Sequence, residues 1–397
     1  MSKKILICND FELLPRKGGP STYLWNLRQY IIENQISNID FLDNFQEAKA
    51  LQVASGSSRF DKGFWKSGFG RNLRAIISFF YSIKRERIDA EPVMSNYDVL
   101  HFHSSRTLYR YRHVLKQLGS RPVIILQSHS PSAWHCEMLE EWFKLSPDSA
   151  YGITRALLQI PDKYAFSRAD YLIFPCEGAM EPYKHSWRQF DTVIKDKKVL
   201  FLPTGTKQAH ASKQVADVRA LYHIPLDAKV ICFAGRHNKI KGYDVLKATA
   251  IAVLAANPNI YFLNAGTPSP LQPLEHPNWI EVGWTNDPHS VINAADYFVL
   301  PNRETYFDLI LLEALSLGKK AVISNTGGNK YFKQFSSPDI HYFESEDVTS
   351  LADLLLSVCA VDKGEPTSTP NLDIFQQHFT ADVFGQKYLE LVNSLNA

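Results

Sequence analysis

Two cations spaced five residues apart suggest a site for a diphosphate group. Arg236 and Lys241 lie in FAGRHNKIKGYDVL (233–246), where an apolar run that reads as a strand gives way to a polar turn and a helix. An Arg side chain binds a phosphate through two parallel hydrogen bonds, and a Lys side chain adds a point charge. Two solvated surface cations are the alternative, and this stretch alone leaves both interpretations open.

A carboxylate inside an apolar helix marks a second candidate position. Glu313 lies in LPNRETYFDLILLEALSLGKKAV (300–322), among residues that are otherwise apolar on every side. A buried carboxylate needs polar partners, and the two neighbouring hydroxyls of a ribose would serve, as would an ion pair with a Lys or Arg. The turn before the helix can aim the backbone N–H groups of Phe307, Asp308 and Leu309 at a phosphate.

Glycines and histidines follow other predicted strands. Gly18 and Gly19 open a helix in PRKGGPSTYLWNL (15–27), where they let the backbone approach a ligand closely or simply form an ordinary turn. The spacing is not GxGxxG, so no nicotinamide fingerprint is present. His103 and His129 each end a predicted strand, and they are either structural or part of one binding rim.

A basic and aromatic segment lies at residues 58–88, with eight Lys or Arg against two Asp or Glu. Residues 73–83 read as a core helix with charged ends. For residues 59–71 we expect contact with an anionic membrane surface or with an acceptor molecule. The side chains expected at such a surface are Lys62, Trp65, Lys66, Arg71 and Arg74.

Elements of an α/β fold must position these residues. Strands are predicted at 3–9, 99–104, 122–129 and 171–176, and again at 229–235, 260–266, 279–284, 296–301, 320–325 and 340–345. Helical patterns lie between them, as at 242–256 and 308–317, and an amphipathic helix is predicted at 380–395. Residues 199–206 read as the connector between two doubly wound series, whose ligands bind beyond the carboxyl ends of the strands.

Length and composition agree with two domains. The chain has 397 residues, five scattered cysteines without metal or disulfide spacing, and no apolar run long enough to span a membrane. Residues 1–200 carry a net charge of +7 and residues 201–397 a net charge of −5, so one half is expected to meet something anionic. No Asp-x-Asp, Walker loop or metal-ligand cluster stands out. We expect a cytoplasmic protein with no nucleic-acid partner.

Taken together, these stretches resemble the retaining glycosyltransferases of family four, which have the GT-B fold. The resemblance runs over most of the chain and rests on the order and spacing of several short motifs, none of which is specific alone. They are Gly18-Gly19, DVLHFH (98–103), His129, ADYLIFPC (169–176), LPTGT (202–206), GR and KG (235–242), AADYFVLPNR (294–303), FDLILLEALSLGKKAV (307–322) and TGG (326–328).

The resemblance implies a nucleotide-sugar donor, UDP-linked, bound by the second domain and no separate cofactor. Arg236 and Lys241 would hold the diphosphate and stabilise the leaving group in place of a metal ion. Glu313 would bind the ribose, and His129 would touch the transferred sugar. The other donor-binding positions that it implies are Gly18, Gly19, Glu304, Phe307, Asp308 and Leu309, with His103 on the acceptor side.

The chain departs from the family where the sugar would lie. The family usually shows two Glu residues separated by seven, but the first position is Thr305, and Glu304 stands one residue early. We therefore predict that Thr305 faces the transferred sugar and that Glu304 points toward Arg303 or solvent. A carboxylate at Asp308 is unfavourable beside a diphosphate unless it caps its own helix.

The predicted fold is GT-B: two facing Rossmann-like, doubly wound parallel-sheet domains with a C-terminal helix that crosses back. Residues 1–204 would bind the acceptor, residues 205–378 the nucleotide-sugar, and the helix of residues 379–397 would pack on the first domain. The predicted activity is metal-independent, retaining transfer of a hexose or N-acetylhexosamine to a cell-surface polysaccharide, lipopolysaccharide or glycolipid, at the inner face of the cell membrane. The alternative is a catalytically silent GT-B protein that binds a partner enzyme or glycan.

Overall fold

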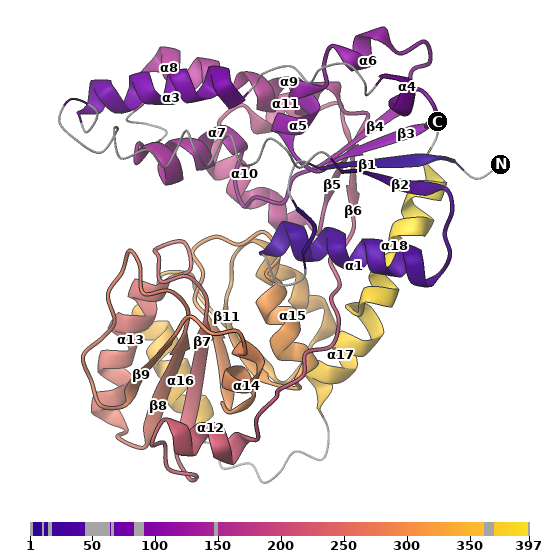
Figure 1. The fold of residues 1–397 in the computed structure, drawn as a ribbon. Coiled ribbons are helices and arrows are strands. Elements are labelled where there is room, and N and C mark those ends of the chain that lie inside the picture. Colours follow the sequence, from indigo (N-terminus) through magenta and orange to yellow (C-terminus); the bar gives the residue numbers. More distant parts are fainter. Residues whose placement is uncertain are drawn as a thin grey trace. The chain divides into compact units, whose positions relative to one another are not determined.

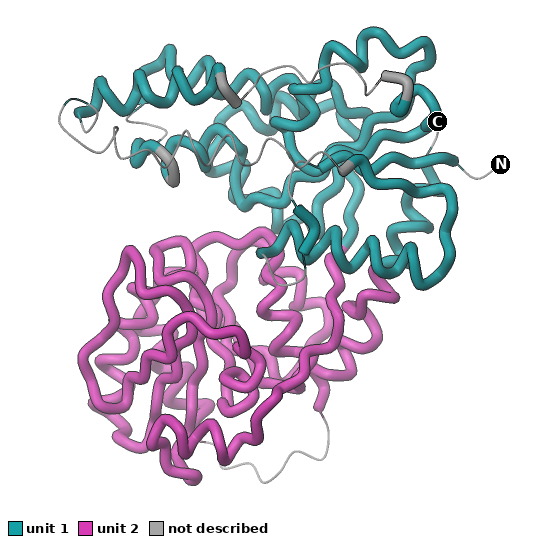
Figure 2. The backbone as a smooth tube through the Cα atoms, viewed as in Figure 1, with its two compact units in different colours: residues 1–202, 385–397 teal, residues 203–384 magenta. Residues whose placement is uncertain are grey.

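The chain divides into two compact units, each with its own parallel sheet. The computed structural model describes residues 3–9, 12–14, 18–43, 64, 67–82, 91–146, 150–360 and 369–395. Unit 1 comprises residues 1–202 and 385–397, and unit 2 comprises residues 203–384 (Figure 2). The sequence predicts domain boundaries after residues 204 and 378. Each sheet has six strands and is surrounded by helices (Figure 1), which is the fold class predicted.

The strands of unit 1 follow the order β2-β1-β3-β4-β5-β6 across the sheet. They are β1 (Ile5–Asn9), β2 (Ile39–Asp43), β3 (Val99–Phe102), β4 (Val123–Gln127), β5 (Tyr171–Phe174) and β6 (Lys198–Phe201). All residues of β1, β3 and β5 are buried, because helices cover both faces of a parallel sheet. This burial explains why the strands read as unbroken apolar runs in the sequence.

Thirteen helical segments, some only one turn long, are described in unit 1 or lead into it. They are α1 (Gly19–Glu33), α3 (Gly68–Ser82), α4 (Glu91–Met94), α5 (Ser105–Arg110), α6 (Val114–Gln117), α7 (Trp134–Glu137), the π-helix η3 (Met138–Trp142), α8 (Gly152–Leu158), α9 (Ile160–Arg168), the 3-10 helix η4 (Glu177–Met180), α10 (Glu181–Ser186), α11 (Phe190–Ile194) and α18 (Ala381–Ser394). The helix α12 (Val215–Leu221) belongs to unit 2. Within the described residues, no helix has both the length and the apolar content to cross a bilayer.

The two edges of the unit 1 sheet differ from the sequence prediction. Residues 198–201 form β6, which pairs with β5, so the connector predicted at 199–206 begins only after this strand. The opposite edge, β2, was not predicted at all. Edge strands are covered on fewer sides, so β6 exposes Lys198 and Phe201, and β2 carries Asp40 and Asp43. Neither strand therefore shows the continuous apolar pattern of the central ones.

Unit 2 repeats the architecture with the strand order β12-β11-β10-β7-β8-β9. Its strands are β7 (Lys229–Ala234), β8 (Ile260–Ala265), β9 (Trp279–Gly283), β10 (Tyr297–Leu300), β11 (Lys320–Ser324) and β12 (Ile340–Phe343). Its remaining helices are α13 (Tyr243–Ala256), α14 (Pro288–Asn293), α15 (Leu309–Ser316), the 3-10 helix η5 (Gly327–Phe335), α16 (Val348–Ala360) and α17 (Pro370–His378). The predicted strands and helices of this half lie within one or two residues of the observed ones.

The C-terminal helix α18 leads the chain back into unit 1, as predicted. Tyr388 is fully buried, and its ring stacks on His101 with the ring centroids 5.8 Å apart. Gly385 lies against the ring of Tyr30, which a Cβ atom at this position would meet at 2.2 Å. A side chain at residue 385 would therefore push the helix away from α1.

Candidate functional site

The predicted donor-binding residues of unit 2 lie near the point where the strand order of its sheet reverses. The chain enters at β7, adds β8 and β9 on one side, and then crosses to build β10, β11 and β12 on the other. The loops that follow β7 and β10, residues 235–242 and 301–308, therefore leave neighbouring strands in opposite directions. In open α/β sheets this position forms the crevice that binds ligands.

Glycines hold these loops in contact. Gly242 has a φ of 65°, and a Cβ atom there would lie 1.7 Å from the carbonyl oxygen of Pro301. Gly327 has a φ of 45°, and its Cβ would lie 2.2 Å from the carbonyl oxygen of Thr305. Any other residue at these two positions would be strained, because its Cβ atom would overlap a backbone carbonyl oxygen. The glycines of the KG and TGG turns are therefore needed for the loops to pack against each other.

Lys241 and Asp308 form an ion pair across the two loops. The Lys241 Nζ atom lies 2.6 Å from Asp308 Oδ1, and about a fifth of each side chain is exposed. Asp308 Oδ2 accepts a hydrogen bond of 2.9 Å from the hydroxyl of Thr305 and another from the amide of Asn302. Asp308 stands at the N-cap position of α15, but its side chain makes no capping hydrogen bond. The condition under which a carboxylate would be tolerated beside a diphosphate, capping of its own helix, is therefore not met, because the Asp308 carboxylate is turned to Lys241.

The residues around this ion pair differ in exposure. Thr305 is only 2% exposed, and Arg236 lies on the exposed side of its loop. Glu304 is partly exposed. Arg303 is braced by Asp244, to which its guanidinium donates at 2.6 and 2.9 Å, and by Glu346 at 2.9 Å.

The carboxylate of Glu313 has a histidine as its partner. Glu313 Oε2 lies 3.0 Å from His289 Nε2, and a fifth of the Glu313 side chain is exposed. The sequence predicts a ribose hydroxyl or a Lys or Arg side chain as the partner of Glu313, and it does not predict His289. The sequence does carry a sign of this helix, because Asp287 followed by Pro288 is typical of a helix start. In the structure Asp287 is the N-cap of α14, and its side chain accepts a hydrogen bond from the backbone N–H of Ser290. This cap fixes the first turn of the helix, and with it His289.

A buried polar cluster lies beside the same loops and was also missed. Tyr243 and Trp279 both donate hydrogen bonds to Glu281 Oε1, the latter at 2.7 Å. His237 stacks on Tyr243 with the ring centroids 3.9 Å apart. Burial raises the pKa of Glu281 and lowers that of His237 to about 4. The cluster links the 235–242 loop, through His237, to α13 and β9.

In unit 1, space is open above the glycine turn. Gly18 has a φ of 93° and stands at the N-cap of α1, whose first residue is Gly19. Among the residues that the structure describes, a Cβ atom at either glycine would have no neighbour within 4 Å. The turn thus leaves room in front of its backbone, which is compatible with a ligand contact and with an ordinary turn, and Gly18 meets the requirement for positive φ.

The two predicted histidines of unit 1 are in direct contact. His103 Nδ1 lies 2.7 Å from His129 Nε2, and the rings are stacked. His101 lies on β3, two residues before His103, and its Nδ1 atom is 3.1 Å from the hydroxyl oxygen of Tyr388. Burial lowers the pKa of His101 to about 3 and that of His103 well below its usual value. These imidazoles are therefore neutral at neutral pH and act as hydrogen-bonding groups, not as cations.

The basic and aromatic segment is described only in part. Lys62, Trp65 and Lys66 lie outside the described residues. Arg71 donates to the carbonyl oxygen of Lys144 at 3.0 Å, and the Arg74 guanidinium lies 6.0 Å from the centroid of the Phe143 ring. Both belong to α3.

Comparison with known proteins places the second half of the chain in context. Residues 228–360, from the start of β7 to the end of α16, match the family model described as Glycosyl transferases group 1. A curated relative, the D-inositol 3-phosphate glycosyltransferase of Saccharomonospora viridis, is 32% identical over a stretch that covers 28% of this chain and 31% of that protein. The match thus spans about a third of the relative's length.

Solved structures resemble the chain over almost its whole length. Sucrose-phosphate synthase from Thermosynechococcus elongatus is 16% identical, with a TM-score of 0.62 and 98% of each chain covered. Anabaena HepE in complex with UDP and glucose is 12% identical, with a TM-score of 0.62, 99% of this chain and 100% of that chain covered. At sequence identities this low, the similarity is evidence for the fold alone. The chain therefore has the GT-B fold, and its residues 228–360 are similar to the group 1 glycosyl transferases.

Proposed function

We propose that this protein is a metal-independent, retaining glycosyltransferase that moves a hexose or N-acetylhexosamine from a UDP-linked donor. The observation that carries the proposal is the meeting of the 235–242 and 301–308 loops at the switch point of the unit 2 sheet, within the stretch that matches the family. Arg236 and Lys241 supply positive charge there for a diphosphate leaving group. The UDP bound by HepE, which has the same fold, supports the choice of base.

Glu313 is suited to hold the ribose of the donor. Its described polar partner, His289, bonds only Oε2, so Oε1 is open to a ribose hydroxyl. Its partial exposure lets a ligand reach it. Thr305 is buried and bonded to Asp308, so it would act on the transferred sugar mainly by holding the Asp308 carboxylate and the turn in place.

The experiment is a screen of UDP-sugars for release of UDP, with and without EDTA. Transfer to an added acceptor would be followed by proton NMR, in which the anomeric coupling constant distinguishes retention from inversion. Arg236→Ala and Lys241→Ala should each slow turnover at least about tenfold, because a charge-assisted contact contributes about 1.5–3 kcal/mol. Full activity in both variants, dependence on a metal ion, or an inverted product would each contradict the corresponding part of the proposal.

The ion pair of Lys241 with Asp308 supports a second candidate function, that of a catalytically silent GT-B protein. The cation expected to bind the diphosphate already has a carboxylate partner at 2.6 Å. A silent protein would bind UDP weakly and release none from any UDP-sugar, while still binding a partner enzyme or glycan. Calorimetry with UDP, run beside the UDP-release screen, separates the two candidates.

For the acceptor we propose a polysaccharide, lipopolysaccharide or glycolipid that is extended at the inner face of the cell membrane, with unit 1 on the membrane. Support comes from α3, which packs beside α8 (Figure 1). Its positions 69, 73, 76 and 80 fall on one helix face, where Phe69 and Phe80 are 56% and 57% exposed. An adjoining face, with Ala75 and Phe79, packs into the core of the unit.

Exposed aromatic side chains extend this face. The ring of Phe69 lies 5.7 Å from that of Phe64 and 6.4 Å from that of Tyr151, and both neighbours are about half exposed. Exposed aromatic residues of this kind suit a membrane interface. Arg71 and Arg74 leave α3 on another side, where they contact the carbonyl oxygen of Lys144 and the ring of Phe143.

Sedimentation with vesicles tests the membrane proposal. The double variant Phe69→Ser with Phe80→Ser should lose most binding to anionic vesicles, whereas Ile251→Ser, at a 59% exposed position of unit 2, should not. Replacing Lys62, Lys66, Arg71 and Arg74 by Gln should weaken binding by about 1 kcal/mol for each charge near the surface, and added salt should act in the same direction. Equal sedimentation of all variants would refute membrane contact through this face.

A further inference from the structure

Three histidines and a tyrosine meet near the carboxyl ends of two central strands of unit 1. His103 follows β3 directly, His129 follows the end of β4 by two residues, and the two strands pair in the sheet. Tyr23 reaches the same place from α1, where its ring centroid lies 4.6 Å from that of His129 and 5.9 Å from that of His103. His101 completes the group, with its ring 4.1 Å from that of His103. The pairing of β3 with β4 therefore brings together two histidines that are 26 residues apart.

The group borders open space on one side. Gly19 precedes Tyr23 by four residues, so both lie on the same face of α1. Among the residues that the structure describes, a Cβ atom at Gly19 would have no neighbour within 4 Å. His129 is partly exposed, whereas His103 is only 2% exposed. His129 is thus the member of the pair that a ligand of unit 1 can reach.

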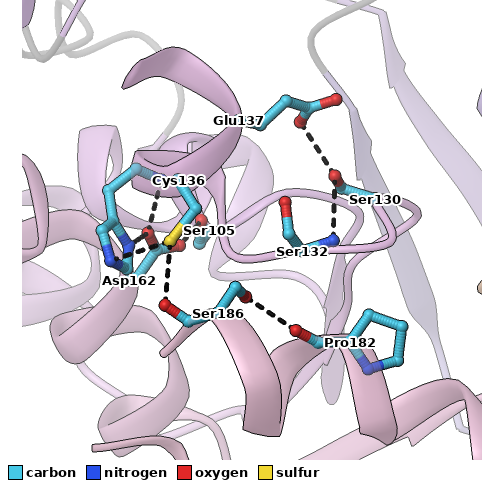
Figure 3. Close-up of polar contacts among 9 residues, drawn as sticks. Ser105, Ser130, Ser132, Cys136, Glu137, Asp162, Pro182 and Ser186 are labelled. Carbon is cyan, nitrogen blue, oxygen red and sulfur yellow. Dashed lines mark hydrogen bonds and ion pairs between the residues drawn. The ribbon is translucent and has the colours of Figure 1, made fainter. Parts of the chain in front are cut away.

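Hydrogen bonds hold the chain that follows His129 (Figure 3). The hydroxyl of Ser130 donates to Glu137 Oε2 at 2.9 Å and accepts from the backbone N–H of Ser132 at 3.4 Å. The carbonyl oxygen of Ser130 accepts a hydrogen bond of 3.0 Å from the hydroxyl of Tyr183, which is fully buried. Because both the side chain and the backbone of Ser130 are bonded, the place of His129 on this loop is fixed.

The ring of His129 is held as well. His103 Nδ1 lies 2.7 Å from His129 Nε2, which is a hydrogen-bond distance. Tyr23 packs against the same ring and is itself held by a hydrogen bond of 2.9 Å from its hydroxyl to Gln127 Oε1. The Nε2 atom of His129 is therefore turned to His103. Its Nδ1 atom has no bonding partner among the described residues and is not enclosed, so it is the nitrogen left for a ligand.

Both imidazoles of the pair are neutral at neutral pH. Burial lowers the pKa of His129 to about 3, and burial together with the two neighbouring histidines lowers the pKa of His103 well below its usual value. A neutral imidazole carries one proton, so one of its nitrogens is a donor and the other an acceptor. The hydrogen bond between His103 and His129 can run in either direction, and each direction fixes both protons.

One of the two directions leaves a buried donor unpaired. If His129 Nε2–H donated, the proton of His103 would lie on its Nε2 atom, which is buried without a partner. Among the backbone groups of proteins, buried N–H groups without an acceptor are rarer than carbonyl oxygens without a donor. The other direction, from His103 Nδ1–H to His129 Nε2, leaves only a bare nitrogen at the buried position. It places the proton of His129 on Nδ1, the nitrogen that a ligand can reach.

We propose that His103 is a positioning residue that fixes His129 with its Nδ1–H directed at a hydroxyl oxygen of a bound sugar. The inference rests on the proposed function, in which both the UDP-linked donor and a glycan acceptor offer such oxygens. As a donor whose proton is fixed, His129 binds an oxygen atom and does not act as a general base. Tyr23 and Gln127 serve the same orientation through the ring contact.

The positions of the protons are measured first, in the free protein. Nitrogen NMR with isotope-labelled histidine at pH 7 shows which ring nitrogen carries the proton, and the signals are assigned with His129→Gln and His103→Asn. His129 and His103 should both be protonated at Nδ1, which is the less favoured form of free histidine. The control His101→Gln alters a neighbouring ring that does not bond His129 and should leave this proton in place. A proton on His129 Nε2 would overturn the proposal, whether or not the protein transfers sugar.

Sugar probes then identify the ligand. The Nδ1 signal of His129 should move with UDP-glucose or UDP-N-acetylglucosamine but not with UDP, if the oxygen belongs to the donor. Movement with free glucose or N-acetylglucosamine alone would assign the oxygen to the acceptor. An equal shift with UDP, or no shift with any of these sugars, would refute the sugar contact. Failure of every UDP-sugar to bind in calorimetry would contradict the proposed function, and the free sugars would still test the contact.

Two substitutions of His103 separate positioning from stability. His103→Asn places an amide N–H close to the lost Nδ1–H, whereas His103→Leu offers no donor. The Leu variant should slow sugar transfer about five- to tenfold at unchanged affinity for UDP, which is the effect of one neutral hydrogen bond, and the Asn variant should recover most of the rate. Equal losses of rate and of thermal stability in both variants would show a structural role only and overturn the positioning role.

Discussion

Removing the ammonium group of Lys241 should harm nucleotide binding in two ways. Lys241→Ala deletes a charge-assisted contact to the diphosphate, which contributes about 1.5–3 kcal/mol. It also leaves the Asp308 carboxylate, now 2.6 Å from the lysine, without its cation. An unpaired carboxylate about 8 Å from one phosphate charge, at an effective dielectric constant of about 20, adds about 2 kcal/mol of repulsion. Affinity for UDP should therefore fall by more than 100-fold.

A double-mutant cycle separates the two effects. In Lys241→Ala with Asp308→Asn the repulsion is gone, while Thr305 and Asn302 keep a partner in the new carboxamide. This double variant should bind UDP about ten- to thirty-fold more tightly than Lys241→Ala alone. Asp308→Asn by itself should bind UDP at least as tightly as the wild type, because Lys241 is then released to the ligand.

The assay is calorimetric titration with UDP, with thermal unfolding of each variant as the control for folding. If the double variant binds no better than Lys241→Ala, the carboxylate does not oppose the diphosphate, and the ion pair lies outside the donor site. If Asp308→Asn instead abolishes binding, the carboxylate orients Lys241 toward the ligand, and the reasoning from competition is refuted.

Three further predictions follow from single contacts. Glu313→Gln should weaken UDP binding at least about tenfold by calorimetry, because an amide replaces a carboxylate that accepts ribose hydroxyls, and unchanged affinity would place the ribose elsewhere. Thr305→Val should lower the free energy of unfolding in urea by about 1 kcal/mol through loss of the hydroxyl bond to Asp308, and a larger effect on turnover than on stability would indicate contact with the sugar. The pKa of His101 is about 3 in the folded state and 6.5 as its ordinary value, so its contribution to stability is present above pH 6.5 and is lost as the pH falls from 6.5 toward 3. Urea unfolding at pH 7, 6 and 5 should show this slope in the wild type and a smaller slope in His101→Gln.

The sequence determined most of the fold because its signals are local. Buried parallel strands are apolar on both faces, so all six strands of unit 2 and four of unit 1 read directly from apolar runs. The glycines at 242 and 327 and the cations at 236 and 241 also stand at positions that strand and helix boundaries fix. The edge strands β2 and β6 escaped prediction because partial exposure removes that pattern.

Only the tertiary structure decided which side chains meet. Lys241 and Asp308 are 67 residues apart, and Glu313 and His289 are 24 residues apart on different helices. Apolar periodicity says which face of a helix is buried, but not which polar group arrives opposite it once the loops close. A sequence records each charge separately, whereas their mutual distance, and hence their electrostatic free energy, exists only in the folded chain.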